Sequence, residues 1–348
     1  MVKYTLRRLI QAIPTFFGIT LLSYMLMVAA PGGPETILVG DPRLSAEQRA
    51  AIAERLGVND PWPVQYLRWL IGNDWQLYDL DGDGEVDDPG QRKGILRGDF
   101  GFSLFSKRPI ISLIAERVPA TLELGFAALF FSIIIGVPIG ILAAVRRGGT
   151  FDSFSRVMAV VFNAVPIFWL GLVLILIFGT WLKNPSGGPL LPMGNRCPIS
   201  VTGECPPVYG RLNHMLLPTF VLAAGGVAVF SRFMRASMLD VISQDYIRTA
   251  KAKGLSDRTV WFKHAARNAM IPIATFLGPA IAGVLGGAPI TEKIFSWPGL
   301  GQLSVNSVIQ QDYPVVMAVV IIAAVGTILG YILSDIMYAL IDPRIRFD

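Results

Sequence analysis

Six segments of this chain are each long and apolar enough to cross the hydrocarbon core of a lipid bilayer. They lie near residues 9–30, 122–145, 158–182, 216–230, 271–290 and 315–341. A transmembrane helix needs about 20 mostly apolar residues to cross roughly 30 Å of hydrocarbon. The fourth segment is the weakest, because Arg232 and Arg235 limit one of its ends. The pattern predicts an all-α integral membrane protein with six transmembrane helices.

The composition agrees with a membrane protein and argues against nucleic-acid binding. Of the 348 residues, 53% are hydrophobic and only 16% are charged. A soluble domain of this length would need more polar residues to cover its surface. The net charge of +5 comes from basic residues at the ends of apolar segments, where they indicate membrane orientation. We therefore expect membrane lipid around this chain, and no nucleic acid.

The first apolar segment resembles a secretory signal peptide in one respect only. Lys3, Arg7 and Arg8 precede it, as basic residues precede the apolar region of a signal peptide. The apolar stretch is too long for that region, and Pro31 follows the one suitable small-residue cleavage site. We expect an uncleaved first helix, with cleavage as the alternative.

The distribution of basic residues predicts that the N- and C-termini are both cytoplasmic. In this orientation 16 of the 30 Lys and Arg residues are cytoplasmic, and the two short outer loops hold 4. The long outer segment holds ten, but long loops count little in this rule. The predicted division is an N-terminal segment with the first helix over 1–30, a large external segment over 31–118 and a five-helix core over 119–348. No internal repeat is visible, which favours half of a pore completed by another subunit.

An acidic stretch in the external segment matches part of a calcium-binding loop. Acidic residues occupy positions 1, 3 and 5, and Gly84 at position 6 allows the sharp turn that such loops need. Position 12 is Gly90, so the bidentate glutamate of a complete EF-hand is missing. The alternative is a solvated acidic turn. The predicted ligands of a structural calcium ion are Asp79, Asp81, Asp83, Glu85 and Asp87.

The two cysteines, Cys197 and Cys205, lie in one predicted outer loop. An external, oxidising compartment and short spacing favour a disulfide, with two free thiols as the alternative. Two polar residues inside apolar segments, Asn163 and Asp335, are candidates for a translocation path. For Asp335 a structural role in helix packing is the alternative. No set of residues indicates catalysis.

The stretch 232–270, between the fourth and fifth segments, is predicted to form a helix–turn–helix on the cytoplasmic side. Asp245 suits the first turn of a helix, and Lys251 and Lys253 suit its negative end. Gly254 fits the left-handed position after the helix, and Leu255 can make the apolar contact that follows such a glycine. Ser256 or Asp257 can cap the next helix. Such a rigid projection favours protein docking, and an ordinary basic loop is the alternative. The predicted docking residues are Asp245, Tyr246, Ile247, Arg248, Thr249, Ala250, Lys251, Ala252, Lys253 and Gly254.

This stretch resembles the EAA loop of bacterial ABC importer permeases, although Arg248-Thr249-Ala250 replaces the usual Glu-Ala-Ala. It is most similar to the dipeptide/oligopeptide branch of that family. The opening, Tyr4-Thr5-Leu6-Arg7-Arg8-Leu9, resembles the "B" type of subunit. The strings that carry the resemblance are Tyr246-Ile247-Arg248-Thr249-Ala250-Lys251-Ala252-Lys253-Gly254-Leu255, His264-Ala265-Ala266-Arg267-Asn268-Ala269-Met270-Ile271-Pro272, Gly98-Asp99-Phe100-Gly101-Phe102-Ser103, Glu116-Arg117-Val118-Pro119-Ala120-Thr121, Phe295-Ser296-Trp297-Pro298-Gly299-Leu300-Gly301 and Asp312-Tyr313-Pro314.

The resemblance implies an inner-membrane subunit that forms half of a pathway for dipeptides or oligopeptides. Its implied partners are a homologous second permease, one or two ATP-binding subunits and an external solute-binding protein. Residues 246–254 would insert into the ATP-binding subunit, which would hold the ATP and magnesium. This chain has no phosphate-binding loop, so we expect neither cofactor nor ATP hydrolysis in it. The alternatives are a secondary carrier or channel driven by an ion gradient, and a membrane scaffold without transport.

Overall fold

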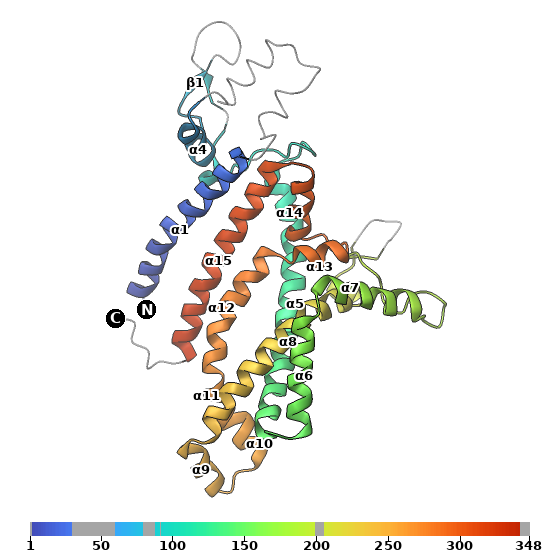
Figure 1. The fold of residues 1–348 in the computed structure, drawn as a ribbon. Helices are drawn as coiled ribbons and strands as arrows, with labels where there is room; N and C mark the ends of the chain where they lie inside the picture. Colours follow the sequence, from blue (N-terminus) through green and yellow to red (C-terminus); the bar gives the residue numbers. More distant parts are fainter. Residues whose placement is uncertain (1, 30–59, 79–87, 91, 199–204, 342–348) are drawn as a thin grey trace. The chain divides into compact units, whose positions relative to one another are not determined.

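The computed structural model describes residues 2–29, 60–78, 88–90, 92–198 and 205–341, with side chains except at 2–5 and 335–341. Helices dominate this part of the chain, and two short strands, β1 (Leu77–Tyr78) and β2 (Asp88–Pro89), pair antiparallel (Figure 1). The α-helices are α1 (Val2–Ala29), α4 (Trp62–Ile71), α5 (Ile110–Val145), α6 (Thr150–Ala164), α7 (Ile167–Leu174), α8 (Leu212–Ile242), α9 (Asp245–Ala252), α10 (Asp257–Thr259), α11 (Ala266–Ala269), α12 (Ile271–Gly286), α13 (Pro289–Ile294), α14 (Leu300–Ile309) and α15 (Tyr313–Ile341). Short 3₁₀ helices are η1 (Ile95–Arg97) and η3 (Val208–Arg211), and π-helices are η2 (Ile175–Trp181) and η4 (Val260–Ala265).

Five helical segments in the described ranges are long and apolar enough to cross a membrane. They cover Leu6–Ala29, Ile110–Val145, Val208–Ile242, Ile271–Ile294 and Tyr313–Ser334. A sixth span results if the bent pair Thr150–Ala164 and Ile167–Trp181 counts as one. The fold is therefore the helical membrane architecture that the apolar segments predict.

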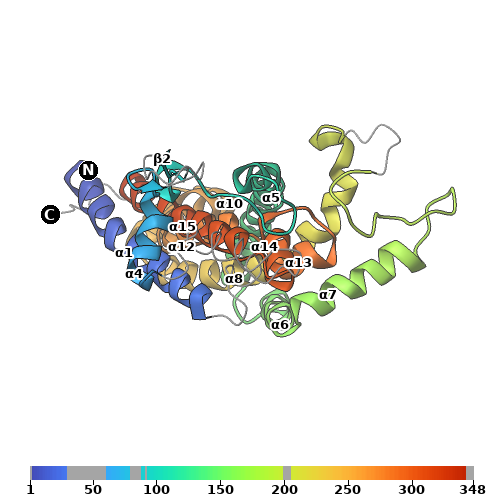
Figure 2. The same ribbon diagram turned by 90° about the horizontal axis from the view of Figure 1, so that it is seen from above.

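The third predicted segment, 158–182, is not one straight helix. The chain bends by 99° between α6 and α7, so that α7 runs crosswise to α6 (Figure 2). The bend falls at Val165 and Pro166, and Val165 has the extended conformation that a following proline favours. Hydropathy does not detect this change of direction, because both arms are apolar.

The fourth predicted segment is longer than expected. Helix α8 continues through Arg232 and Arg235 to Ile242 without a break. Arg235 is accommodated there because it pairs with Asp152 of α6, at 2.6 Å between Nε and Oδ1. A basic residue that looked like the end of an apolar segment therefore lies inside the helix.

By its internal contacts, the chain divides into two compact units. The first unit contains residues 1–8, 118–302 and 325–348, and the second contains 9–117 and 303–324. In the first unit α5 and α8 approach closely at two glycines. A Cβ atom at Gly140 would lie 2.5 Å from the carbonyl oxygen of Ser231, and one at Gly136 would lie 3.0 Å from that of Val227. These contacts match the small-residue spacing of tightly packed membrane helices.

In the second unit α4 packs against the C-terminal half of α1 through aromatic side chains. The ring centroid of Tyr24 lies 5.6 Å from that of Tyr66 and 5.4 Å from that of Trp69. The hydroxyl groups of Thr20 and Tyr66 are 2.9 Å apart and hydrogen-bonded. Arg97 joins the end of α4 to the loop after it, donating to the Ile71 carbonyl at 2.5 Å and to both carboxylate oxygens of Asp74.

Candidate functional site

Helix α9 forms a short projection after the end of α8 in the first unit (Figure 1). It begins at Asp245, after the extended residue Gln244, and ends at Ala252. Gly254 follows with a φ of +73°, a left-handed conformation that costs glycine little. Its N–H donates to the carbonyl of Lys251 at 2.9 Å. The helix and its glycine stop thus lie where the sequence places them.

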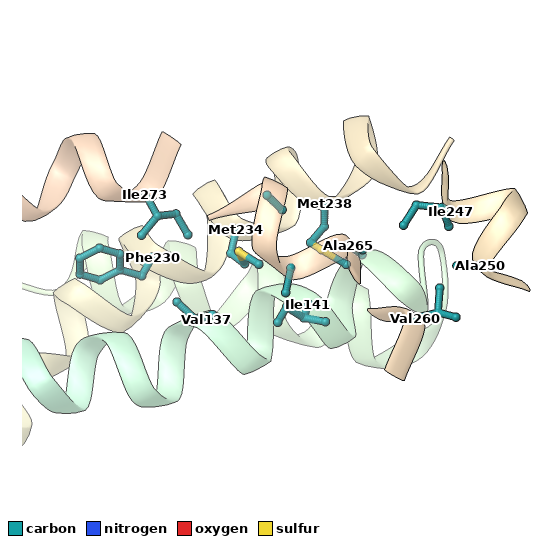
Figure 3. Packing of buried hydrophobic residues seen from close by; sticks show 13 residues of the cluster. Val137, Ile141, Phe230, Met234, Met238, Ile247, Ala250, Val260, Ala265 and Ile273 are labelled. Carbon is teal, nitrogen blue, oxygen red and sulfur yellow. The ribbon is translucent and has the colours of Figure 1, made fainter. Parts of the chain in front are cut away.

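One face of α9 is fixed by a buried apolar cluster. Ile247, which is 1% exposed, and Ala250 belong to one buried cluster with Met234 and Met238 of α8 and Val260 of the following helical segment. Figure 3 shows Ile247, Ala250 and Val260 near one another, with Met238 and then Met234 further along α8. Burial of Ile247 contributes roughly 1.5–3 kcal/mol by area. The cluster therefore ties the projection to the long helix that precedes it.

The opposite face of α9 is exposed and charged. The side chain of Arg248 is 76% exposed, and its guanidinium lies 3.6 Å from the Asp245 carboxylate. Tyr246 is also exposed. Lys251 Nζ lies 4.4 Å from the ring centroid of Trp261, a cation–π contact that links α9 to η4. A rigid helix that presents an aromatic and several charges is suited to docking a protein.

The segment after α9 differs in three details from the expectation. The second helix is interrupted by the π-helix η4, with α10 before it and α11 after it. Ser256 stands at the N-cap position before α10, but its hydroxyl bonds to that of Thr259 at 3.0 Å and caps no backbone N–H. Leu255, whose position suggested an apolar contact, is exposed.

A cavity of about 380 Å³ lies among α5, α8, α12 and α13 of the first unit. Gly283 and Gly287 belong to its wall. The predicted path residue Asn163 does not line this cavity and is exposed near the α6–α7 bend. The side chain of Asp335 lies outside the described residues. The polar side chains of the wall are those of Thr121, Ser132 and Glu292.

Comparison with protein families shows to which family the chain that carries this projection and cavity belongs. Residues 136–347 match the family described as the inner membrane component of binding-protein-dependent transport systems. Residues 1–125 match the N-terminal region of the same membrane component.

The chain belongs to this permease family.

Curated relatives cover the permease from end to end. It is 39% identical over 349 residues to the oligopeptide transport system permease protein AppB of Bacillus subtilis, with 100% of both chains covered. It is 37% identical to the dipeptide transport system permease protein DppB of Escherichia coli, with 99% of both chains covered. The glutathione transport system permease protein GsiC of Salmonella paratyphi A is 35% identical, over 100% of both chains. The permease is thus a multi-pass inner-membrane transport component.

Solved structures share the fold of the permease. One chain from inward-facing structures of the MetNI methionine ABC transporter aligns with a TM-score of 0.53 at 17% identity. The alignment covers 68% of the permease and 99% of that chain. At this identity the likeness shows the fold alone.

The two cysteines of the permease are joined by a disulfide, Cys197–Cys205, with their Cα atoms 5.3 Å apart. The adjoining loop is held on α5 by Glu123, whose carboxylate accepts hydrogen bonds from Arg196 and Arg211 at 2.6–2.9 Å. Arg211 also lies 3.2 Å from the sulfur of Cys205. The disulfide and the ion pairs of Glu123 therefore both restrain the segment that contains Arg196 and Cys197.

The predicted calcium ligands Asp79, Asp81, Asp83, Glu85 and Asp87 lie outside the described residues. In the part of the permease that the structure describes, no three His, Cys, Asp or Glu side chains are grouped so as to hold a metal ion. The calcium hypothesis stays a prediction from the sequence.

The sequence did not predict the roles of two buried carboxylates in the permease. Asp152 accepts a forked pair of hydrogen bonds from Arg235, and Glu292 accepts one from the Gln302 N–H at 2.8 Å. The available signals were an arginine near the end of an apolar segment and a glutamate just after one. Neither signal identifies the partner, because Arg235 lies 83 positions from Asp152 and the Gln302 N–H belongs to another helix than Glu292.

Proposed function

We propose that this chain is one transmembrane subunit of an ABC importer for peptides and that it forms half of the translocation pathway. Two of the three relatives named above carry dipeptide or oligopeptide transport in their names, and the third carries glutathione, itself a small peptide. The proposed partners are a homologous second permease, one or two ATP-binding subunits and an external solute-binding protein. ATP and magnesium belong to the ATP-binding subunits.

The observation that carries the coupling role is the two-sided character of α9. Ile247 and Ala250 anchor one face in a buried cluster, and Tyr246 and Arg248 stand exposed on the other. An ordinary loop that is basic only because of the membrane orientation does not need buried apolar side chains to hold it in place. We infer that residues 245–254 enter a cleft of the ATP-binding subunit and pass its movement to α8.

The solute path is proposed to include the cavity among α5, α8, α12 and α13. Its wall is mostly apolar, and its polar groups are the hydroxyls of Thr121 and Ser132 and the carboxylate of Glu292. Such a wall can accept varied side chains. Asn163 is proposed as a path residue near the bend that ends α6, and Asp335 as one in α15.

A charge reversal on α9 tests the coupling role. The variant Arg248→Glu changes an exposed side chain, so it leaves the buried anchor intact. Lys183→Glu applies the same change of charge at an exposed site in the predicted outer loop. We expect the ATP-binding subunit to co-purify with wild type and with Lys183→Glu, and to be lost from Arg248→Glu.

Two other results would reject the importer. One is a wild-type chain that purifies without any ATPase, and the other is solute transport by the isolated chain under an ion gradient. The second result favours the secondary-carrier alternative.

A further inference from the structure

A single carboxylate joins three parts of the first unit close to the α9 projection. Asp152 lies in the first turn of α6 and is 1% exposed. Its Oδ1 accepts a hydrogen bond from Arg235 Nε at 2.6 Å, and its Oδ2 accepts one from Arg235 Nη2 at 2.8 Å. Oδ2 also accepts the N–H of Gly148 at 2.9 Å. Asp152 thus ties the α5–α6 turn and α6 to α8.

The forked geometry makes this contact directional. Two parallel N–H···O bonds between a guanidinium and a carboxylate fix both distance and orientation. The cluster nearby includes Met234 and Met238, whose flexible side chains adapt to small displacements. A shift of α8 along its axis would therefore be absorbed by the apolar contacts but resisted by the ion pair.

The pair lies between α9 and the bend. Arg235 precedes Asp245 by ten residues, or about 15 Å along a helix. α8 is continuous over most of that distance, and Ile247 of α9 shares a buried cluster with Met238. At its other end α6 stops at the 99° bend, beyond which α7 packs near Phe295. A ring contact between Phe162 and Phe220 joins α6 and α8 again near the bend.

We propose that Asp152 and Arg235 are positioning residues that make α6 follow α8, so that a displacement of α9 reaches the α6–α7 bend. The Asp152–Arg235 ion pair, called the link below, has this role only if α9 binds the ATP-binding subunit, so the proposal rests on the proposed function. Apolar packing by itself would keep the helices together but would let them slip during the ATP cycle.

Two single variants distinguish the effect of the link from the effect of apolar packing between α6 and α8. Asp152→Asn keeps the shape of the side chain and removes the charge that orders the fork. Arg235→Lys keeps the charge but replaces the fork with a single ammonium group. The matched control is Arg156→Gln, because Arg156 contacts the same carboxylate at 3.5 Å from within α6 and cannot join α6 to α8.

The experiment uses the complete importer, with the second permease, the ATP-binding subunits and the external solute-binding protein, reconstituted in lipid. Spin labels at Val157→Cys on α6 and Asp240→Cys on α8 report the distance between the helices, since both positions are exposed. The distance is measured without nucleotide and after trapping with ATP and vanadate. Uptake of radiolabelled glycyl-leucine per ATP hydrolysed is measured in the same preparations.

In wild type and Arg156→Gln we expect one label distance in both states. In Asp152→Asn the distance should shift or broaden on trapping, and uptake per ATP should fall about tenfold. For Arg235→Lys we expect a change in label distance and in uptake per ATP between those of wild type and Asp152→Asn. This variant provides the test if Asp152→Asn does not assemble. Wild-type distances and uptake ratios in both link variants would overturn the proposal. Failure of the wild-type chain to retain an ATPase would instead reject the proposed function, and that result appears at purification.

Discussion

Asp312 accepts a hydrogen bond from the hydroxyl of Ser103 at 2.5 Å, although 209 positions separate the two residues in the sequence. The same carboxylate accepts the N–H of Leu104 at 3.0 Å, and Asp312 is only 3% exposed. Both residues belong to sequence strings that carry the family resemblance. The contact explains in physical terms why an aspartate and a serine stand at these two places within the second unit.

Replacing Asp312 with alanine should destabilise the second unit. The change leaves the Ser103 hydroxyl and the Leu104 N–H without their acceptor, and each unsatisfied buried group costs about 1–3 kcal/mol. Thermal unfolding of the purified permease in detergent measures the effect. Ser106→Ala is the control, because Ser106 is exposed and offers the cluster only its backbone N–H. Equal melting temperatures for both variants would contradict the prediction.

Glu292→Gln should destabilise the first unit. The carboxylate accepts hydrogen bonds from the N–H groups of Gln302 and Ala288 and from Thr121 Oγ1. A glutamine turns an N–H₂ group toward donors, and losing a hydrogen bond to a charged group costs about 1.5–3 kcal/mol. The matched variant is Glu116→Gln in an exposed pair with Arg108, where about 0–1 kcal/mol is expected. Denaturant titration measures the loss of unfolding free energy in both variants. Equal losses would contradict the prediction.

Two adjacent glycines in α8 should respond oppositely to alanine. A Cβ atom at Gly226 would lie 2.7 Å from Cβ of Ser132 on α5, whereas one at Gly225 would meet nothing within 4 Å. Overpacking typically costs about 1–3 kcal/mol, so Gly226→Ala should lower the melting temperature. Gly225→Ala should leave it unchanged or raise it, because alanine stabilises a helix by up to about 1 kcal/mol. A larger loss at Gly225 would show that the helices are arranged differently.

Removal of the disulfide should loosen the loop that contains Cys197 and Cys205 without unfolding the permease. Closing a loop with a sequence separation of 8 contributes about 2–3 kcal/mol in the chain-entropy model. The double variant Cys197→Ser with Cys205→Ser should melt earlier than wild type under oxidising conditions and equally under reducing ones. Thiol labelling of the native protein supplies the check, since rapid modification of both cysteines would disprove the bond.

Acid should weaken the contact between Asp74 and Arg97. The hydrogen bond from Arg97 holds the pKa of Asp74 below its ordinary value of 3.8. The folded pKa is the lower one, so this stabilisation is complete above the unfolded pKa and is lost as the pH falls through the folded value. Unfolding of Asp74→Asn should therefore depend less on pH than unfolding of wild type below about pH 4. Parallel pH profiles would reject the contact.

The sequence by itself determined the elements that depend on local pattern. Apolar length predicted the membrane helices, and Asp245, Lys251 and Gly254 predicted the extent of α9, because helix length and helix stops are set by neighbouring residues. The strings around Tyr246 and His264 identified the family. Local chemistry was enough for these, since each signal lies within a few turns of one helix.

Only the tertiary structure decided which charged groups meet. Asp152 with Arg235, and Ser103 with Asp312, join residues 83 and 209 positions apart, and no local pattern pairs them. The 99° bend at Pro166 was also decided there, because a proline inside an apolar segment is equally compatible with a mild kink. Burial makes these pairs strong, and burial depends on helices brought together from distant parts of the chain.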